Sequence, residues 1–184
     1  MRHFIIAIFL LLSPCLHAQN QPTFEQALYD AQNGDSSAYG WVGFFYYEGK
    51  SVARNYSEAI KWLKKAAENG DSRCYAYLGS SYFELQNYQE AVTWLKKAVN
   101  NGDTRVYVGL GASYKQLKQY SEAISWLKKA TDYDDNQAYF LLSQCYYAQF
   151  DYEKAIIWAK KAANNGETRA YIALGASYMQ LKQY

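Results

Sequence analysis

Residues 55–86 read NYSEAIKWLKKAAENGDSRCYAYLGSSYFELQ, and this stretch returns from Asn87, Gln119 and Asp151 with a period of 32 residues. A diverged copy precedes it at residues 24–54. Self-similarity at such a spacing is typical of a solenoid, in which each unit is too small to bury its own apolar face and its neighbours complete the core. The sequence therefore predicts a stack of repeats.

The predicted domain organisation follows from this period. Residues 1–18 are assigned to a signal peptide and residues 19–184 to one repeat domain. The units run over about 24–54, 55–86, 87–118, 119–150 and 151–182, with a partial unit from 183. Because Gln183 and Tyr184 begin another copy, we expect the sequence to be a fragment of a longer repeat array.

Each unit has the pattern of two helices. The first helix carries an apolar stripe of helical period over residues 59–67. Asn55 and Asn87 are each followed three residues later by glutamate, which is the spacing of a capping box. Asp151 is followed by lysine at that place, which predicts a weaker helix start.

Glycine recurs at two places in the unit. One set follows the first helix, where a left-handed conformation is favoured: Gly70, Gly102 and Gly166. Asp134 replaces this glycine in one unit, which predicts a less regular turn there. A second set lies inside the second helix, and Ser143 keeps the same site small in the remaining unit: Gly79, Gly111 and Gly175. Each costs about 1 kcal/mol relative to alanine, which predicts close approach of a neighbouring helix.

Two repeat families are similar to this pattern. The set Leu78, Gly79, Tyr82, Tyr88, Ala91 and Ala98 resembles the tetratricopeptide repeat. The first step, of 36 residues, is similar to the Sel-one-like repeat, whose extra residues lengthen the turn between helices; its pattern is Ala38, Gly43, Tyr46, Gly49, Val52, Ala59, Trp62, Ala66, Ala67 and Gly70. Both resemblances imply an all-α fold, a right-handed α-solenoid of stacked antiparallel helix pairs that binds proteins.

The N-terminus has the order of a secretory signal peptide. A short basic start precedes an apolar run over residues 4–12 and a small, polar exit over residues 13–18. The run is too short to span a bilayer, so we expect cleavage after Ala18, export to the periplasm or the outside of the cell, and no membrane insertion of the mature chain. The alternative is a lipoprotein signal acylated at Cys15, although Pro14 occupies a place where a small residue is preferred.

Composition excludes several classes of function. The formal net charge is +2 and the basic residues are spread along the chain, so no nucleic-acid partner is expected. Both histidines, His3 and His17, lie in the predicted signal peptide, which excludes histidine-based triads and metal sites from the mature chain. The sequence contains no phosphate-binding loop, cysteine cluster or nucleophile elbow, so we expect no enzyme, cofactor or metal. Asp132, Asp134 and Asp135 are interpreted as turn residues.

Two further features receive structural interpretations. Cys74 and Cys145 occupy different positions in units two steps apart, too far for a disulfide, so we expect buried free thiols. Lysine pairs recur in every full copy and are assigned to a solvated outer face: Lys64-Lys65, Lys96-Lys97, Lys128-Lys129 and Lys160-Lys161.

Most aromatic residues fall on the repeat lattice. Fifteen of the 20 tyrosines share three lattice positions: Tyr56, Tyr88, Tyr120, Tyr152 and Tyr184; Tyr39, Tyr75, Tyr107, Tyr139 and Tyr171; Tyr46, Tyr82, Tyr114, Tyr146 and Tyr178. One tryptophan recurs in the same way: Trp62, Trp94, Trp126 and Trp158. We interpret these rings as packing residues between helices.

The candidate binding residues lie outside that lattice. If the second helix of each pair lines the inner surface, an aromatic groove edged by arginines results: Trp41, Phe44, Tyr47, Arg73, Tyr77, Phe83, Arg105, Phe140, Tyr147 and Arg169, with Met179 beside them. Rings and guanidinium groups are common anchors for an extended peptide or a helix. The alternative is that these rings pack against adjacent helices and the arginines pair with nearby acids.

The sequence predicts an exported, non-catalytic scaffold that binds another protein or a peptide segment through the concave face of the solenoid. A structural module that stacks end to end between chains is the alternative, because the helix predicted over residues 168–182 keeps an apolar face with no helix after it. An enzyme acting on cell-wall or peptide substrates comes third.

Overall fold

The computed structural model describes residues 21–133 and 135–182. Within these residues the chain forms ten α-helices, three short 3-10 turns and no strand, which confirms the predicted all-α repeat fold. The chain divides into two compact units, of which unit 1 ends at Leu85 and unit 2 begins at Gln86. The predicted signal peptide, Asp134 and the last two residues lie outside the described residues.

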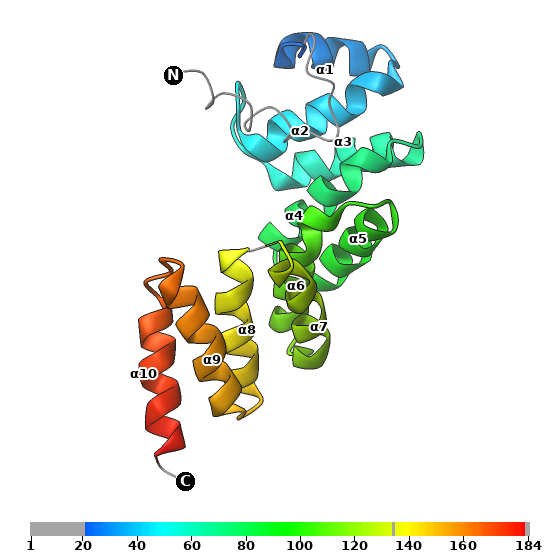
Figure 1. Cartoon of the computed structure of the whole chain (residues 1–184). Coiled ribbons are helices and arrows are strands. Elements are labelled where there is room, and N and C mark those ends of the chain that lie inside the picture. Colours follow the sequence, from blue (N-terminus) through cyan, green and yellow to red (C-terminus); the bar gives the residue numbers. More distant parts are fainter. Residues whose placement is uncertain (1–20, 134, 183–184) are drawn as a thin grey trace, which may run out of the picture. The chain divides into compact units, whose positions relative to one another are not determined.

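Unit 1 contains two helix pairs (Figure 1). Its helices are α1 (Phe24–Gln32), α2 (Tyr39–Glu48), α3 (Tyr56–Glu68) and α4 (Tyr75–Glu84). The 3-10 turns η1 (Ser36–Ala38) and η2 (Ser72–Cys74) lead into α2 and α4. Each helix packs against the next one along the chain, so the core lies between consecutive helices.

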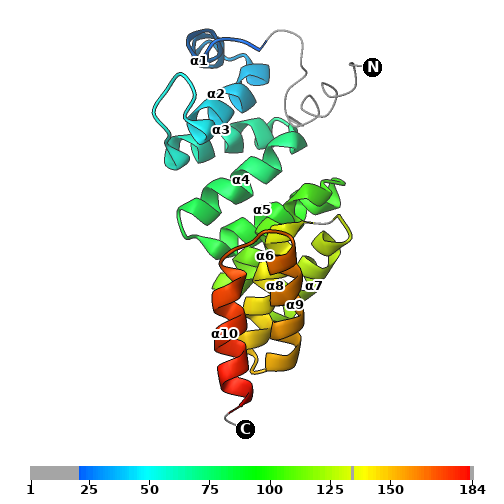
Figure 2. The ribbon, with the colours of Figure 1, turned by 60° about the vertical axis from the view of Figure 1, so that its left-hand side comes forward.

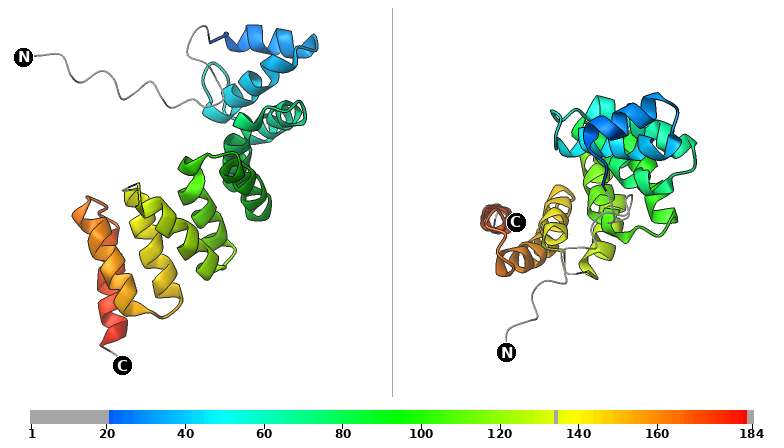
Figure 3. Two further views of the ribbon diagram at one scale, coloured as in Figure 1. Left: turned by 45° about the vertical axis from the view of Figure 1, so that its right-hand side comes forward. Right: turned by 90° about the horizontal axis from the view of Figure 1, so that it is seen from above.

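Unit 2 contains three helix pairs. Its helices are α5 (Tyr88–Asn100), α6 (Tyr107–Gln116), α7 (Tyr120–Thr131), α8 (Asn136–Ala148), α9 (Tyr152–Asn164) and α10 (Ala170–Leu181), and η3 (Thr104–Val106) precedes α6. Consecutive helices α8, α9 and α10 lie side by side in Figure 2 and in both views of Figure 3. The last pair therefore packs on the preceding one as a repeat should.

The helix starts follow the period read from the sequence. The first helices of the last four pairs begin at Tyr56, Tyr88, Tyr120 and Tyr152, which are 32 residues apart. The longer first step has its extra residues in the turn between α2 and α3, which runs over residues 49–55, whereas the turn between α6 and α7 runs only over residues 117–119. The lengthened turn is the one that the Sel-one-like resemblance implies.

The helix caps correct two expectations. The Asn55 side chain accepts a hydrogen bond from the backbone N–H of Glu58 at 3.1 Å, but Asn87 makes no side-chain cap bond, so the capping box expected there is wrong. The expected weak start at Asp151 is also wrong. Its carboxylate accepts from the backbone N–H of Lys154 at 3.1 Å and forms an ion pair with the Lys154 ammonium, at a helix end that favours negative charge.

The turns after the first helices confirm the role of glycine. Gly70, Gly102 and Gly166 have φ angles of 86°, 87° and 88°, the left-handed region that glycine adopts without strain. Among the described residues, a 3-10 turn precedes α2, α4 and α6, but none precedes α10 or α8. Before α8, Asp135 accepts from the backbone N–H of Gln137 at 2.9 Å and starts the helix directly.

The glycines inside the second helices mark close helix contacts. A Cβ on Gly43 or Gly111 would lie 2.5 Å from the Cγ of the leucine that the next helix presents, Leu63 or Leu127. At Gly175 a Cβ would meet nothing within 4 Å, so the predicted close approach of a neighbouring helix is wrong for this glycine. The reason is that no helix of the described residues covers this face of α10.

We predict opposite effects for the same substitution at two lattice-equivalent glycines. Gly111→Ala lowers the free energy of unfolding by about 1–3 kcal/mol, because the buried Leu127 has no free space into which to move. Gly175→Ala raises it by up to about 1 kcal/mol through helix propensity alone. Thermal and urea unfolding followed by circular dichroism measures both, and a stabilising Gly111→Ala would contradict the assigned contact.

Candidate functional site

Four of the predicted binding residues meet in unit 1. The Phe44 ring of α2 contacts Trp41 at 6.3 Å and Tyr77 of α4 at 5.5 Å between ring centroids, both in edge-to-face geometry. Tyr47 contacts Tyr77 at 5.3 Å and Tyr56 of α3 at 5.8 Å. Spacings of three residues along α2 place its three rings on one face, and we call these five residues the aromatic cluster of unit 1.

Burial divides the aromatic cluster into a base and an accessible part. Phe44 is only 7% exposed, whereas Trp41, Tyr47 and Tyr77 are half-buried. Burial raises the pKa of Tyr47, and a hydrogen bond with the Ser80 side chain opposes this rise. The cluster therefore combines apolar ring surface with a neutral hydroxyl group, as interface tyrosines commonly do.

The three predicted arginines pair with acids two residues earlier. Arg73 Nε lies 2.8 Å from Asp71 Oδ1, and Arg105 makes the same contact with Asp103. Arg169 pairs with Glu167, whose carboxylate also accepts from the Arg169 backbone N–H at 3.1 Å. All three arginines are exposed. Their pairing with nearby acids agrees with the alternative interpretation of these residues.

The remaining predicted residues occupy separate places. Phe83, on α4, and Tyr147, on α8, are half-buried, and the Tyr147 ring lies 5.4 Å from that of Tyr152. Phe140 is 8% exposed, and the Arg169 guanidinium lies over its ring at 4.8 Å. The candidate site thus consists of a connected aromatic cluster in unit 1 and individual contacts in unit 2.

Sequence reasoning missed one polar residue beside these positions in unit 2. Lys115, on α6, is half-buried and hydrogen-bonds to the Gln144 side chain of α8. Burial lowers the pKa of Lys115. Lys115 occupies the same repeat position as Phe83 and Tyr147 and is the one charged residue at that position. This difference was the sign in the sequence that could have identified it.

Cys74 and Cys145 are buried and form no disulfide, as predicted. Burial raises the pKa of Cys145 to about 11. The reactive form of cysteine is the thiolate, so this side chain stays protonated at neutral pH. Cys145 is therefore a packing residue.

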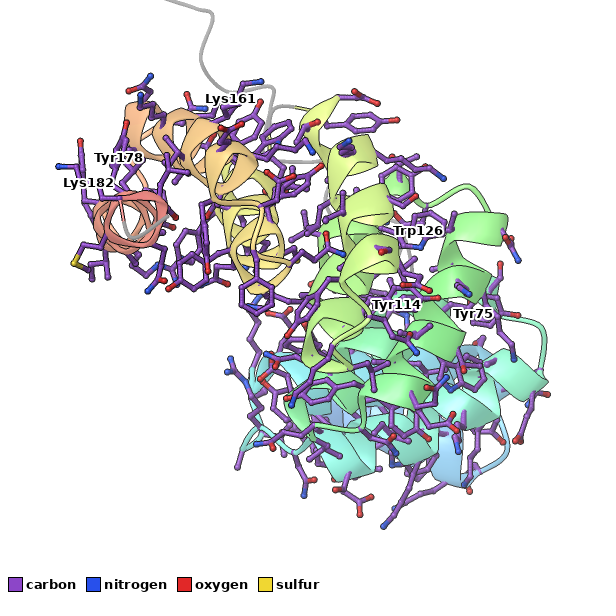
Figure 4. The ribbon with its side chains drawn as sticks, turned by 90° about the horizontal axis from the view of Figure 1, so that it is seen from below. Tyr75, Tyr114, Trp126, Lys161, Tyr178 and Lys182 are labelled. Carbon is purple, nitrogen blue, oxygen red and sulfur yellow. The ribbon has the colours of Figure 1, made fainter. Side chains whose placement is uncertain are left out.

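The lysine pairs have a role that sequence reasoning missed. The second lysine of each pair lies over the tryptophan three residues before it, with ammonium-to-centroid distances of 4.3, 4.0, 4.1 and 4.5 Å: Lys65, Lys97, Lys129 and Lys161. The first lysine reaches a tyrosine of the following helix in three pairs: Lys64 to Tyr82, Lys96 to Tyr114 and Lys160 to Tyr178. Figure 4 labels four residues that take part in these contacts: Tyr114, Trp126, Lys161 and Tyr178. The ammonium groups thus cover ring faces while remaining near water.

Within residues 21–133 and 135–182, no group of three or more histidine, cysteine, aspartate or glutamate side chains has the arrangement of a metal site. The helices of the same residues also lack a segment with both the length and the hydropathy that crossing a bilayer requires.

A model of one protein family matches most of the chain. The model described as anaphase-promoting complex, cyclosome, subunit 3 matches residues 52–130 and 116–184. These two matches overlap and together cover well over half of the chain. None of the curated protein sequences matches the chain.

Solved structures are similar to the chain in fold and in repeat type. The Escherichia coli protective antigen c5321, which displays an SLR fold, is 28% identical with a TM-score of 0.62, over 87% of this chain and 38% of that one. A Sel1 repeat protein from Oxalobacter formigenes is 29% identical with a TM-score of 0.58, over 84% of this chain and 66% of that one. The chain thus spans less than two thirds of either protein. MamA, at 23% identity and a TM-score of 0.66, over 80% of this chain and 87% of that one, supports the fold alone.

We predict a strongly acidic carboxyl group at the start of α10. Hydrogen bonds from the Arg169 side chain and backbone lower the pKa of Glu167 from 4.5 to about 2. Because the pKa is depressed in the folded chain, the stabilisation is complete above about pH 4.5 and is lost as the pH falls through about 2. Carboxyl NMR titration measures the midpoint, and Arg169→Gln should move it back toward 4.5. A midpoint near 4.5 in the unsubstituted chain would contradict the assigned bonds.

Proposed function

Because the chain belongs to the tetratricopeptide-like family described as anaphase-promoting complex, cyclosome, subunit 3, we propose that it is an exported, non-catalytic scaffold for another protein or a peptide segment. Repeat families of this type typically bind other proteins and carry no catalytic site. In this proposal the second helix of each pair contributes to a concave binding face. The observation that supports it most is the aromatic cluster of unit 1.

The aromatic cluster has the physical properties of a binding anchor. Its rings are held by edge contacts between 5.3 and 6.3 Å before any ligand arrives. Fixed rings lose little side-chain entropy on binding, and their half-buried faces still offer apolar area. A partner that covers Trp41, Tyr47 and Tyr77 therefore gains burial at a small ordering cost.

The same contacts indicate the chemistry of the ligand. The accessible part of the aromatic cluster consists of the rings of Trp41 and of three tyrosines, each with a hydroxyl group, so mainly apolar side chains of an extended peptide or a helix fit it best. Each arginine already has a carboxylate partner, so the arginines orient a ligand at the edge and contribute less affinity than the rings. We propose a mainly apolar peptide segment as the ligand class.

Peptide selection tests this proposal without knowledge of the natural partner. A displayed library of 12-residue peptides is selected against the chain, and binding of the resulting synthetic peptides is measured by calorimetry. Trp41→Ala with Tyr47→Ala should weaken binding at least about tenfold, which corresponds to about 1.4 kcal/mol. Phe44 is kept because alanine at this buried position opens a cavity.

A matched control variant separates binding from folding. Tyr29→Ala with Tyr133→Ala removes two aromatic rings that are 65% and 64% exposed and lie outside the aromatic cluster. This control should bind within about twofold of the unsubstituted chain, and circular dichroism should show both double variants folded. Equal affinity of the Trp41/Tyr47 variant and the control would reject the aromatic cluster as the binding site.

Export is the second part of the proposal and has its own test. Expressed with its leader in a bacterial host, the chain should be recovered outside the cytoplasm with Gln19 at its N-terminus, as measured by mass spectrometry. Ile8→Arg should block export because it places a charge in the apolar run. Cys15→Ser should change nothing, whereas loss of processing in this variant would support the lipoprotein alternative.

A further inference from the structure

Lys115 is the one half-buried cation among the described residues of unit 2. It lies near the C-terminal end of α6, and α8 packs against this helix. Burial lowers the pKa of its ammonium group. Removing a charge from water costs free energy unless an opposite charge or a full set of hydrogen bonds offsets the loss. The partners of Lys115 therefore decide what this side chain can do.

None of the described carboxylates pairs with Lys115. The ion pairs that the structure shows in unit 2 use other cations: Arg105 with Asp103, Lys154 with Asp151, and Arg169 with Glu167. The titratable group that acts on Lys115 is the thiol of Cys145, whose pKa of about 11 keeps it protonated at neutral pH. The ammonium group of Lys115 thus lacks a counter-charge within the described part of the chain.

The hydrogen bond of Lys115 goes to a neutral amide. Its ammonium group donates to Oε1 of Gln144 on α8. An ammonium group carries three N–H donors and a primary amide carries two. After this bond, two donors of Lys115 and both donors of Gln144 have no partner among the described residues. The two side chains therefore present a group of donors at one place.

Two positions of the repeat change together here. The position of Lys115 holds a ring or methionine in the other units: Tyr47, Phe83, Tyr147 and Met179. The position of Gln144 holds a ring or a small side chain in the other units: Phe44, Ser80, Ala112 and Ala176. A cation and an amide meet only where α6 faces α8, and there they bond to each other. Packing of the repeat needs neither group, because the other units pack without them.

The donor group is accessible to a ligand. Lys115 and Gln144 are half-buried, so part of each side chain reaches water. Helices α7 to α10 follow Lys115 in the structure, so its accessible part is what remains after the following repeats have packed. Tyr147, which is also half-buried, follows Gln144 by three residues on the same face of α8. A ligand at the donors would therefore also contact an aromatic ring.

The chemistry of these donors favours a carboxylate. Four donors without an acceptor suit an anion, and hydrogen bonds that join a cation to an anion are about twice as strong as neutral ones. A single ammonium group balances the charge of one carboxylate, whereas a phosphate carries about two negative charges at neutral pH. In a peptide, the carboxylate belongs either to an aspartate or glutamate side chain or to the C-terminus.

We infer that Lys115 and Gln144 form a subsite for one carboxylate group of the peptide ligand, on the second-helix face of unit 2. This inference rests on the proposed function, because it requires a peptide ligand. It adds one acidic group to the mainly apolar segment proposed above. The subsite lies within unit 2 and uses no residue of the aromatic cluster.

The test removes the charge from each side of the contact. Libraries of 12-residue peptides, displayed with blocked and with free C-termini, are selected against the full chain, and synthetic peptides are then measured by calorimetry. Lys115→Met should weaken binding at least about tenfold, because methionine has no donor. Changing the acidic residue of the peptide to its amide, or amidating its C-terminus, should weaken binding equally for the group that occupies the subsite. Both changes together should add less than about twofold to either one, because they remove the same contact.

Matched variants separate binding from folding. Lys128→Met removes the same charge from an exposed position of α7 and should bind within about twofold of the unsubstituted chain. Lys115→Met should unfold at the same temperature or higher, because the repeat already uses methionine at this position in α10 and a half-buried charge is removed. Gln144→Ala, which introduces the residue of the preceding unit, should weaken binding at least about threefold through the loss of two donors.

The outcomes distinguish this subsite from the proposed function. Peptides without an acidic group, or peptides that bind Lys115→Met as tightly as Lys128→Met, would overturn the subsite and leave peptide binding intact. Failure to select any peptide would reject both. An acidic peptide that depends on Lys115 but is indifferent to Trp41→Ala with Tyr47→Ala would support the subsite and reject the aromatic cluster.

Discussion

The stacking of this repeat depends on one contact, the approach of a leucine to a residue that has no side chain. Leu63 and Leu127 are completely buried, and each lies where a Cβ on Gly43 or Gly111 would come within 2.5 Å. This contact sets the spacing between the second helix of one pair and the first helix of the next, and the tyrosine–tryptophan contacts at 5.8 Å follow at the same spacing. Where the glycine becomes Ser143, the equivalent leucine becomes the smaller Ala159, and both are buried. The serine side chain therefore offsets part of the volume that is lost from leucine to alanine, as close packing favours.

The sequence alone predicted the helices and the lattice because both depend on periodicity. Identical residues at intervals of 32 must have nearly identical surroundings in a stack, so helix starts, glycine turns and ring positions could be assigned from one copy and extended to the rest. The caps could not be assigned in this way. Asn55 and Asn87 are the same residue, but Asn55 follows the long turn with φ −150° and ψ 97°, whereas Asn87 follows a short turn with φ −88° and ψ 71°. The backbone angles do not decide the cap by themselves, because Asp151 has φ −85° and ψ 73°, close to those of Asn87, and its carboxylate still accepts from the Lys154 backbone N–H.

The sequence allowed us to predict which residues form the candidate site, but not which partner each long side chain contacts. Separating Trp41, Phe44, Tyr47 and Tyr77 from the lattice aromatics identified rings that the structure brings together in unit 1. The arginines have a visible local signal, an acid two residues earlier in each copy, yet the choice between this acid and a ligand depends on side-chain geometry. The cation–π contacts of the lysines depend on rotamers in the same way. Patterns therefore locate side chains on a helix face, while the partner of a long side chain is decided by the packing around it.

The departures of α10 from its own repeat are informative for the same reason. Ile172 and Met179 occupy the register of Val108 and Lys115 in α6, and the half-buried Lys115 reaches Gln144 of α8 there. Lys115 is half-buried because α8 packs on α6, whereas Met179 is 63% exposed, since no helix of the described residues lies beside it at that place. Ile172 is 77% exposed for the same reason, although Val108 at the equivalent position of α6 is half-buried. Register therefore assigns a residue to a helix face, while the neighbouring helix decides whether that residue is buried or exposed.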